Sequence, residues 1–388
     1  MKDKKFETQA IRAQLERSDY NEHSVPVYLT SSFIFDTAEE MRAAFNDESD
    51  DYIYSRYLNP GTTEFVNKVC LLEGAEAGVA HASGMGSIYT TFMALLKSGD
   101  HIVSCSSVFG ATHALFTKYF PKLGISYSYF NTKNVNEIEK LIKPETRFIY
   151  LETPTNPAIE LIDLEFVASI AKKHKKLLIV DNCFATPYLQ QPIKLGADLV
   201  IHSATKYMDG QGRVLGGVVV GKKELINDIY LFGRLTGPSM SPFNAWILSK
   251  SLETLAVRMD RHCENALFIA EALEKNSALE NVSYPFLKSH PHYSIAKKQM
   301  KAGGGIITVT VKGGYEAASK FMNKLQIIKI SPNLGDVRSI ATHPASSTHC
   351  KLSEEERLSV GITPGLIRIS IGLENKEDIL NDIQQALN

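Results

Sequence analysis

Residues 65–220 alternate short β-rich runs with helical patterns, and this alternation limits the possible folds more than any other feature of the chain. The strand candidates are 77–82, 101–105, 147–152, 176–181, 197–203 and 216–221. Several are continuous apolar runs, as expected for strands buried on both faces of a parallel sheet. Between them, 164–176 has a helical period that places Phe166, Ile170 and Ala171 on one face. This order predicts an open α/β fold with a mostly parallel sheet and helices on both faces.

The chain has 388 residues, which is too long for one ordinary hydrophobic core. Residues 1–60 are extended in pattern and rich in tyrosine, so we expect an N-terminal arm. Residues 61–250 carry the α/β alternation and form the expected main domain. A long helical stretch over 245–276 should then connect to a smaller α+β domain, 251–388.

Composition excludes several classes of function. The net charge of −1 gives no electrostatic basis for binding nucleic acid or an acidic membrane surface. The polar start of the chain does not resemble a secretory signal, and no apolar run is long enough to cross a bilayer. The five cysteines are scattered and include no C-x-x-C pair. We therefore expect a cytoplasmic protein without a metal site or a disulfide framework.

Chemically distinctive side chains stand where the buried strands end. Asp181 closes one apolar run, and Ser203, Thr205 and Lys206 follow the next run. The stretch 83–86 (Ser-Gly-Met-Gly) lies where a helix should begin, and its glycines allow backbone N–H groups to approach an anion. Since open α/β sheets place ligands at the carboxyl ends of their strands, these groups should share one site.

This combination matches the requirements of pyridoxal phosphate. The cofactor needs a lysine for its aldehyde, an anion site for its phosphate and an acid that keeps its ring nitrogen protonated. Lys206 is therefore interpreted as a reagent, although a single lysine in such a motif is usually only a solvated charge. A nicotinamide dehydrogenase is disfavoured because "GMGSIY" and "GQGRVL" lack the third glycine of the dinucleotide motif. A non-catalytic protein of this fold would be expected to lose Lys206, which is present.

Seven stretches, in order and over nearly the whole chain, resemble the trans-sulfuration family of pyridoxal-phosphate enzymes of methionine and cysteine metabolism. They are "YSRYLNPG", "HASGMGS", "ETPTNP", "VDNCFATP", "HSATKYMDGQGRVLGG", "THPASSTH" and "IRISIGLE". The resemblance implies the aspartate-aminotransferase-like fold, called fold type I, with pyridoxal 5'-phosphate as cofactor. It also implies a small amino acid as substrate.

The resemblance assigns roles to individual residues. Lys206 would bind the cofactor covalently and later shuttle protons, and Asp181 would pair with the pyridine nitrogen. Arg368 would hold the substrate α-carboxylate, since arginine offers bidentate geometry, and Asn156 would lie near the cofactor ring. The implied phosphate ligands are the backbone of Gly84 and Met85 and the hydroxyls of Ser203 and Thr205.

The arm carries two further residues of the family pattern. By the resemblance, Tyr54 and Arg56 would reach the phosphate in a neighbouring subunit, so the active site would require at least a dimer. A homotetramer built from two dimers is what the family suggests.

Four positions depart from the commoner family pattern. Phe109 stands at the ring-stacking position, where tyrosine is usual, so a phenol that could join proton transfer is missing. Ala111 stands where methionine γ-lyases typically have cysteine. Cys183 replaces a threonine, and Asn333, expected near the substrate, replaces a serine. The combination of "VFG", "DGQGR" and "NLGD" is most similar to O-succinylhomoserine sulfhydrylases.

The expected reaction is therefore γ-replacement on an O-acylhomoserine, the succinyl ester favoured, with sulfide giving homocysteine for methionine biosynthesis. Cystathionine γ-synthase and O-acetylhomoserine sulfhydrylase activities remain alternatives. Methionine or cystathionine γ-lyase activity is the next alternative, because replacement and elimination share most of their path.

Overall fold

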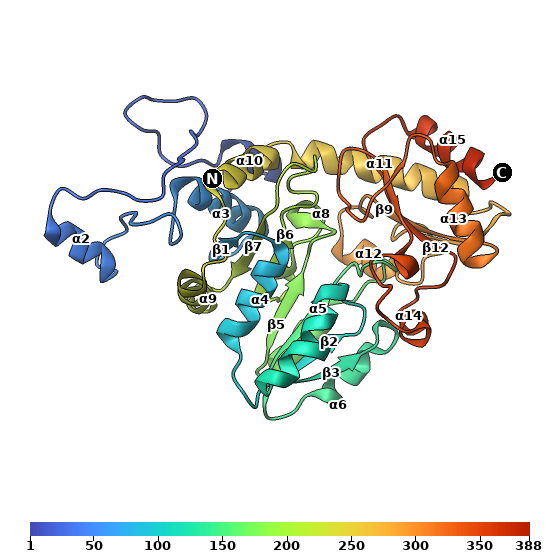
Figure 1. The fold of residues 1–388 in the computed structure, drawn as a ribbon, viewed down its shortest axis with the longest axis horizontal. Coiled ribbons are helices and arrows are strands. Elements are labelled where there is room, and N and C mark those ends of the chain that lie inside the picture. Colours follow the sequence, from blue (N-terminus) through green and yellow to red (C-terminus); the bar gives the residue numbers. More distant parts are fainter.

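The computed structural model describes residues 1–388, and a seven-stranded sheet lies at its centre (Figure 1). The strand order is β1-β7-β6-β5-β4-β2-β3. The pairings from β6 through β3 are parallel, and β7 runs antiparallel to both β1 and β6. The predicted, mostly parallel α/β sheet is confirmed. Its strands are β1 (Ala77–His81), β2 (His101–Cys105), β3 (Ser126–Phe130), β4 (Thr146–Glu152), β5 (Leu177–Asp181), β6 (Leu199–Ser203) and β7 (Gly217–Gly221).

All six predicted strands are present, with boundaries that differ by at most two residues. The sequence pattern missed β3, which lies at the edge of the sheet beside β2. Its sequence, "SYSYF", alternates serine with tyrosine and includes no apolar run. An edge strand of this kind is only half buried, so it lacks the hydrophobic pattern that identified the central strands.

Helices pack against the central sheet and around the strands of the second half of the chain (Figure 1). They are α1 (Phe6–Arg12), α2 (Ala38–Phe45), α3 (Pro60–Glu73), α4 (Gly84–Leu95), α5 (Gly110–Ala114), α6 (Ile138–Leu141), α7 (Leu164–Lys173), α8 (Thr186–Leu189), α9 (Lys223–Thr236), α10 (Pro242–Leu252), α11 (Leu255–Leu273), α12 (Tyr293–Gln299), α13 (Gly314–Lys324), α14 (Glu354–Ser359) and α15 (Lys376–Leu387). None of these helices is both long and apolar enough to cross a membrane.

Local sequence explains where several helices begin. The Asn59 side chain accepts the N–H of Gly61, and Thr62 completes a capping box at the start of α3. Asp163 caps α7 through the N–H of Phe166.

The predicted buried face of α7 was partly wrong, because Phe166 is 38% exposed. Val167, one position on, is fully buried in its place.

The second half of the chain forms a separate five-stranded sheet in the order β10-β11-β12-β9-β8. It packs with α11, α13 and α15 around a hydrophobic cluster distinct from that of the main sheet. The expected single connecting helix is instead two helices, since α10 ends at Leu252 and α11 begins at Leu255. In Figure 1, α11 runs from the main sheet to the C-terminal elements. The strands of this second sheet are β8 (Leu279–Ser283), β9 (Ile306–Val311), β10 (Lys329–Ile330), β11 (Ile340–Thr342) and β12 (Leu366–Ser370).

The first 60 residues contain little regular structure apart from α1 and α2. Figure 1 shows α2 and its flanking loops projecting away from the rest of the chain. Tyr20 and Ile34 are almost fully exposed in this segment. The division into an arm, a main domain and a C-terminal domain, with boundaries at 60 and 250, stays a prediction.

Candidate active site

A cavity of about 500 Å³ opens at the carboxyl ends of β4, β5 and β6. It brings together ten of the twelve residues predicted from the sequence: Gly84, Met85, Phe109, Asn156, Asp181, Ser203, Thr205, Lys206, Asn333 and Arg368. Parallel strands bring their carboxyl ends to one edge, which explains how residues so distant in sequence meet there. The predicted pair Tyr54 and Arg56 lies outside this cavity.

Lys206 follows β6 in a tight turn and points its amine at the loop before β11. Its Nζ donates a hydrogen bond to Oδ1 of Asn333 at 2.7 Å. Burial lowers the pKa of Lys206, and the Arg368 guanidinium lowers it further. A lowered pKa raises the fraction of neutral amine, which is the nucleophilic form.

Asp181 ends β5 and is only 7% exposed. Its Oδ1 accepts the backbone N–H of Cys183 at 3.0 Å, and burial raises its pKa to about 6. The raised pKa reflects a missing countercharge, since a buried carboxylate is costly without a cation. A protonated ring nitrogen would supply that cation.

Glu152 also lines the cavity and was not predicted from the sequence. It ends β4 in register with Asp181 on β5, so both side chains lie on one face of the sheet. Its Oε2 accepts the backbone N–H of Phe109 at 3.0 Å, which fixes the start of α5. Burial raises the pKa of Glu152 well above its usual value, and Asp181 raises it further. An acidic residue ending a buried strand was the available signal, and it had already identified Asp181.

The start of α4 forms a cradle for an anion. Ser83 caps the helix through the N–H of Gly86 at 3.0 Å. A Cβ atom on Gly84 would lie 2.6 Å from Cβ of Ser203, so only glycine allows α4 to approach β6 this closely. The Thr205 hydroxyl bonds both backbone groups of Gly216, at 3.1 and 3.2 Å, which pins it beside the cavity.

Arg368 lies on β12 and is 2% exposed, yet no carboxylate pairs with it. Its guanidinium donates to Oδ1 of Asn156 at 2.9 Å and to the carbonyl oxygens of Pro332 and Asn333 at 3.0 and 2.9 Å. Its Nε is buried without a partner, and burial lowers its pKa to about 10. This cation can therefore bind the carboxylate of a ligand by donating hydrogen bonds to it.

These residues fit pyridoxal phosphate. The cradle at Gly84 with Ser203 could take the phosphate, Asp181 the ring nitrogen, and Lys206 the aldehyde. Arg368 lines the same cavity without a carboxylate partner, which suits a second anionic group there. The structure contains no group of three or more His, Cys, Asp or Glu side chains arranged to hold a metal ion.

Comparison with known proteins agrees with this chemistry. The family model described as "Cys/Met metabolism PLP-dependent enzyme" matches residues 7–388. An O-succinylhomoserine sulfhydrylase of Pseudomonas aeruginosa is 45% identical over 98% of this chain and 95% of its own length. An L-methionine γ-lyase of Fusobacterium nucleatum is 44% identical over 100% of this chain and 99% of its own.

A solved structure agrees as well. A chain from Campylobacter jejuni that contains a pyridoxyl-lysine monophosphate superposes with a TM-score of 0.94 at 34% identity. The match covers 98% of this chain and 99% of that one. The chain therefore belongs to the family of pyridoxal-phosphate-dependent enzymes of cysteine and methionine metabolism, and pyridoxal phosphate is its cofactor.

Proposed function

We propose that this enzyme catalyses γ-replacement on an O-acylhomoserine, with O-succinylhomoserine favoured, using sulfide to give homocysteine. The observation that carries the proposal is one cavity lined by the Lys206 amine, the Asp181 carboxylate and the Arg368 guanidinium, with which no carboxylate of the chain pairs. An amino-acid substrate requires all three. The acyl group leaves as its carboxylate, and the sulfide sulfur takes its place on Cγ.

The protein's residues divide the work of this reaction. Pyridoxal phosphate, when bound, withdraws electrons from the substrate Cα and so makes its proton acidic. Arg368 binds the α-carboxylate and orients the substrate, with Asn156 holding the guanidinium. Lys206 accepts the Cα proton and later returns a proton, which its lowered pKa favours. Asp181 would hold the protonated ring nitrogen, and Phe109, which lines the same cavity, would supply an aromatic surface for the ring.

Asn333 supports the sulfhydrylase assignment over the other family activities. Its side chain contacts the Lys206 amine directly, and its backbone oxygen accepts from Arg368. A departure from the commoner family residue thus lies between the two groups that handle the substrate. The relative described as an O-succinylhomoserine sulfhydrylase agrees with this assignment.

γ-Elimination is the second candidate, because γ-lyase relatives match at 44% identity. Ala111, where those lyases typically have cysteine, weighs against it. The test is a steady-state comparison of succinyl and acetyl esters, each with sulfide or cysteine. We expect the highest kcat/KM for the succinyl ester with sulfide. Efficient methionine cleavage with neither ester turned over would establish the lyase instead.

We also propose that Tyr54 and Arg56 complete the active site of a neighbouring copy, in a homotetramer built from two dimers. In this structure Arg56 bonds the backbone oxygen of Arg234 and lies against the rings of Tyr54 and Tyr57, away from the Lys206 cavity. The exposed arm that carries them supports a role outside their own subunit.

Arg56→Ala is therefore expected to lose bound cofactor in gel filtration, because one phosphate contact is removed. Arg42→Ala, an exposed arm arginine paired with Glu48, is the control and should retain the cofactor. Mixing Arg56→Ala and Lys206→Ala subunits after reversible dissociation should restore about one quarter of wild-type activity, since half of the dimers then contain one intact site. No recovery in a confirmed mixed dimer would contradict the shared site.

A further inference from the structure

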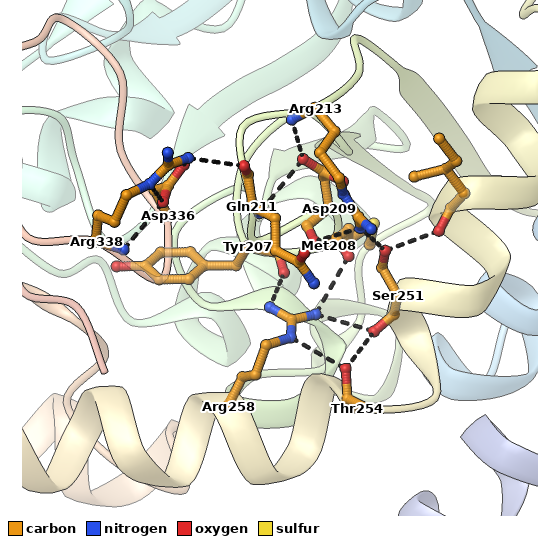
Figure 2. Close-up of polar contacts among 11 residues, drawn as sticks. Tyr207, Met208, Asp209, Gln211, Arg213, Ser251, Thr254, Arg258, Asp336 and Arg338 are labelled. Carbon is orange, nitrogen blue, oxygen red and sulfur yellow. Dashed lines mark hydrogen bonds and ion pairs between the residues drawn. The ribbon is translucent and has the colours of Figure 1, made fainter. Parts of the chain in front are cut away.

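Arg258 is a buried arginine outside the cavity, in the first turn of α11, and only 5% exposed. Figure 2 shows its guanidinium facing the loop that follows Lys206 and the end of α10. Its donors reach the carbonyl oxygens of Tyr207 (2.7 Å), Ser251 (3.0 Å) and Met208 (3.3 Å) and the hydroxyl of Thr254 (3.3 Å). All four partners are neutral.

No carboxylate compensates this cation directly. The nearby acids pair with other arginines: Asp209 with Arg213 at 2.9 Å and Asp336 with Arg338 at 2.8 Å (Figure 2). Burial lowers the pKa of Arg258 to about 10. A buried cation without an ion-pair partner is costly, and the N-terminal turn of a helix disfavours positive charge. Helix stability and ion pairing therefore do not account for this residue.

The contacts of Arg258 converge on the turn that carries the reactive lysine. Within this turn the N–H of Gly210 bonds the carbonyl of Lys206 at 2.8 Å. The next two carbonyls, of Tyr207 and Met208, are the ones that Arg258 binds. Gly210 has φ +70°, and a Cβ atom there would lie 2.0 Å from Nη1 of Arg258. The glycine thus permits both the turn and the close approach of the guanidinium.

The same turn is joined to the loop that carries Asn333. The N–H of Val337 bonds the carbonyl of Gly210 at 2.8 Å, and Arg338 bonds the carbonyl of Gln211 at 2.9 Å. Arg258, on α11, contacts another part of the same turn through the carbonyls of Tyr207 and Met208. The lysine and its acceptor Asn333 are therefore set in place by contacts with elements of the C-terminal unit.

We propose that Arg258 is a positioning residue for Lys206: its forked contacts to the carbonyls of Tyr207 and Met208 fix the direction from which the amine meets the cofactor and the substrate Cα. This inference rests on the proposed role of Lys206. The planar fork of arginine is needed, because one ammonium group cannot bond three carbonyls of two segments with the same geometry.

The test compares holoenzymes of wild type, Arg258→Met and Arg258→Lys. Arg261→Met is the matched control, since Arg261 is exposed one turn further along α11. The first readout is a pH titration of the visible absorption band of the bound cofactor, which reports the ionisation of its linkage to Lys206. The second is the split between kcat and KM with the best substrate, per bound cofactor. Thermal stability is recorded separately.

We expect Arg258→Met to lower kcat by about 10- to 100-fold with KM changed less than about threefold, because a misdirected amine slows proton transfer more than binding. The apparent pKa of the visible band should move by at least about half a unit, and Arg258→Lys should recover part of both effects. Arg261→Met should match wild type.

Arg258→Met that loses only thermal stability, with kcat and the titration unchanged, would overturn the proposal. If Arg258→Met does not fold, the test uses Arg258→Lys and Gly210→Ala instead. Wild-type kcat and a wild-type titration in both of these variants would also overturn the proposal. A colourless wild-type protein would instead refute the proposed function. The two failures are therefore distinguishable.

Discussion

Lys206→Ala is expected to lower kcat at least about 10³-fold, because it removes the group that binds the cofactor and moves the Cα proton. Borohydride reduction followed by peptide mass analysis should fix the cofactor to residue 206 in wild type and to no residue in the variant. The truncation leaves space within a cavity of about 500 Å³. A small primary amine should therefore enter and restore part of the activity in proportion to its concentration.

The control for this experiment is Lys222→Ala, which removes a half-exposed lysine paired with Asp198 at the opposite end of β6. It should keep wild-type colour, reduction product and kcat. If Lys206→Ala kept the same coloured band and the same reduced peptide, Lys206 would not be the attachment point. Activity unaffected by added amine would argue against proton transfer by Lys206.

The fold was predictable because burial on both faces leaves a direct trace in sequence. β5 and β6 begin with the wholly apolar runs 177–180 and 199–201, and the polar residues that follow these runs include Asp181 and Lys206. The glycines before α4 were equally readable, since the close approach of α4 to β6 excludes a side chain at Gly84. Ten site residues therefore met in one cavity as expected.

Other features depend on contacts that no local pattern encodes. Glu152 acquires its place from its register with Asp181 on β5 and from the backbone of Phe109, 43 positions away. Arg258 would be read from sequence as an ordinary helix cation, because its acceptors lie about 50 positions earlier. The roles of Tyr54 and Arg56 depend on another copy of the chain.

Partial burial accounts for the local errors. On α7, Phe166 and Val167 are both apolar and adjacent, so periodicity alone did not decide which faced the sheet. The break between α10 and α11 lies at Glu253 and Thr254, in the middle of a pattern that stays helical. The break brings Ser251 and Thr254 to the Arg258 guanidinium, so it belongs to a tertiary arrangement.

Asp181→Asn should separate stability from catalysis. Burial raises the pKa of Asp181 from 3.8 to about 6, so the folded apoprotein binds more protons than the unfolded chain between these values. The free energy of unfolding of the apoprotein therefore falls as pH rises through that window. The full destabilisation by the buried Asp181 charge is present above about pH 6. This cost is on the order of 3 kcal/mol, so a neutral asparagine should stabilise the apoprotein at pH 7.5.

In the holoenzyme the same substitution should lower kcat at least about 10³-fold, because asparagine cannot keep the ring nitrogen protonated. Calorimetry of the apoprotein at pH 7.5 should show a Tm raised by about 3 °C, with the difference vanishing near pH 4. Asp228→Asn, which removes an exposed carboxylate on α9, should change neither quantity. A Tm difference independent of pH, or a variant with wild-type kcat, would contradict a buried carboxylate held for the cofactor. The raised apoprotein Tm and the lowered holoenzyme kcat follow from one cause: the protein leaves Asp181 without a countercharge, and the cofactor supplies that countercharge.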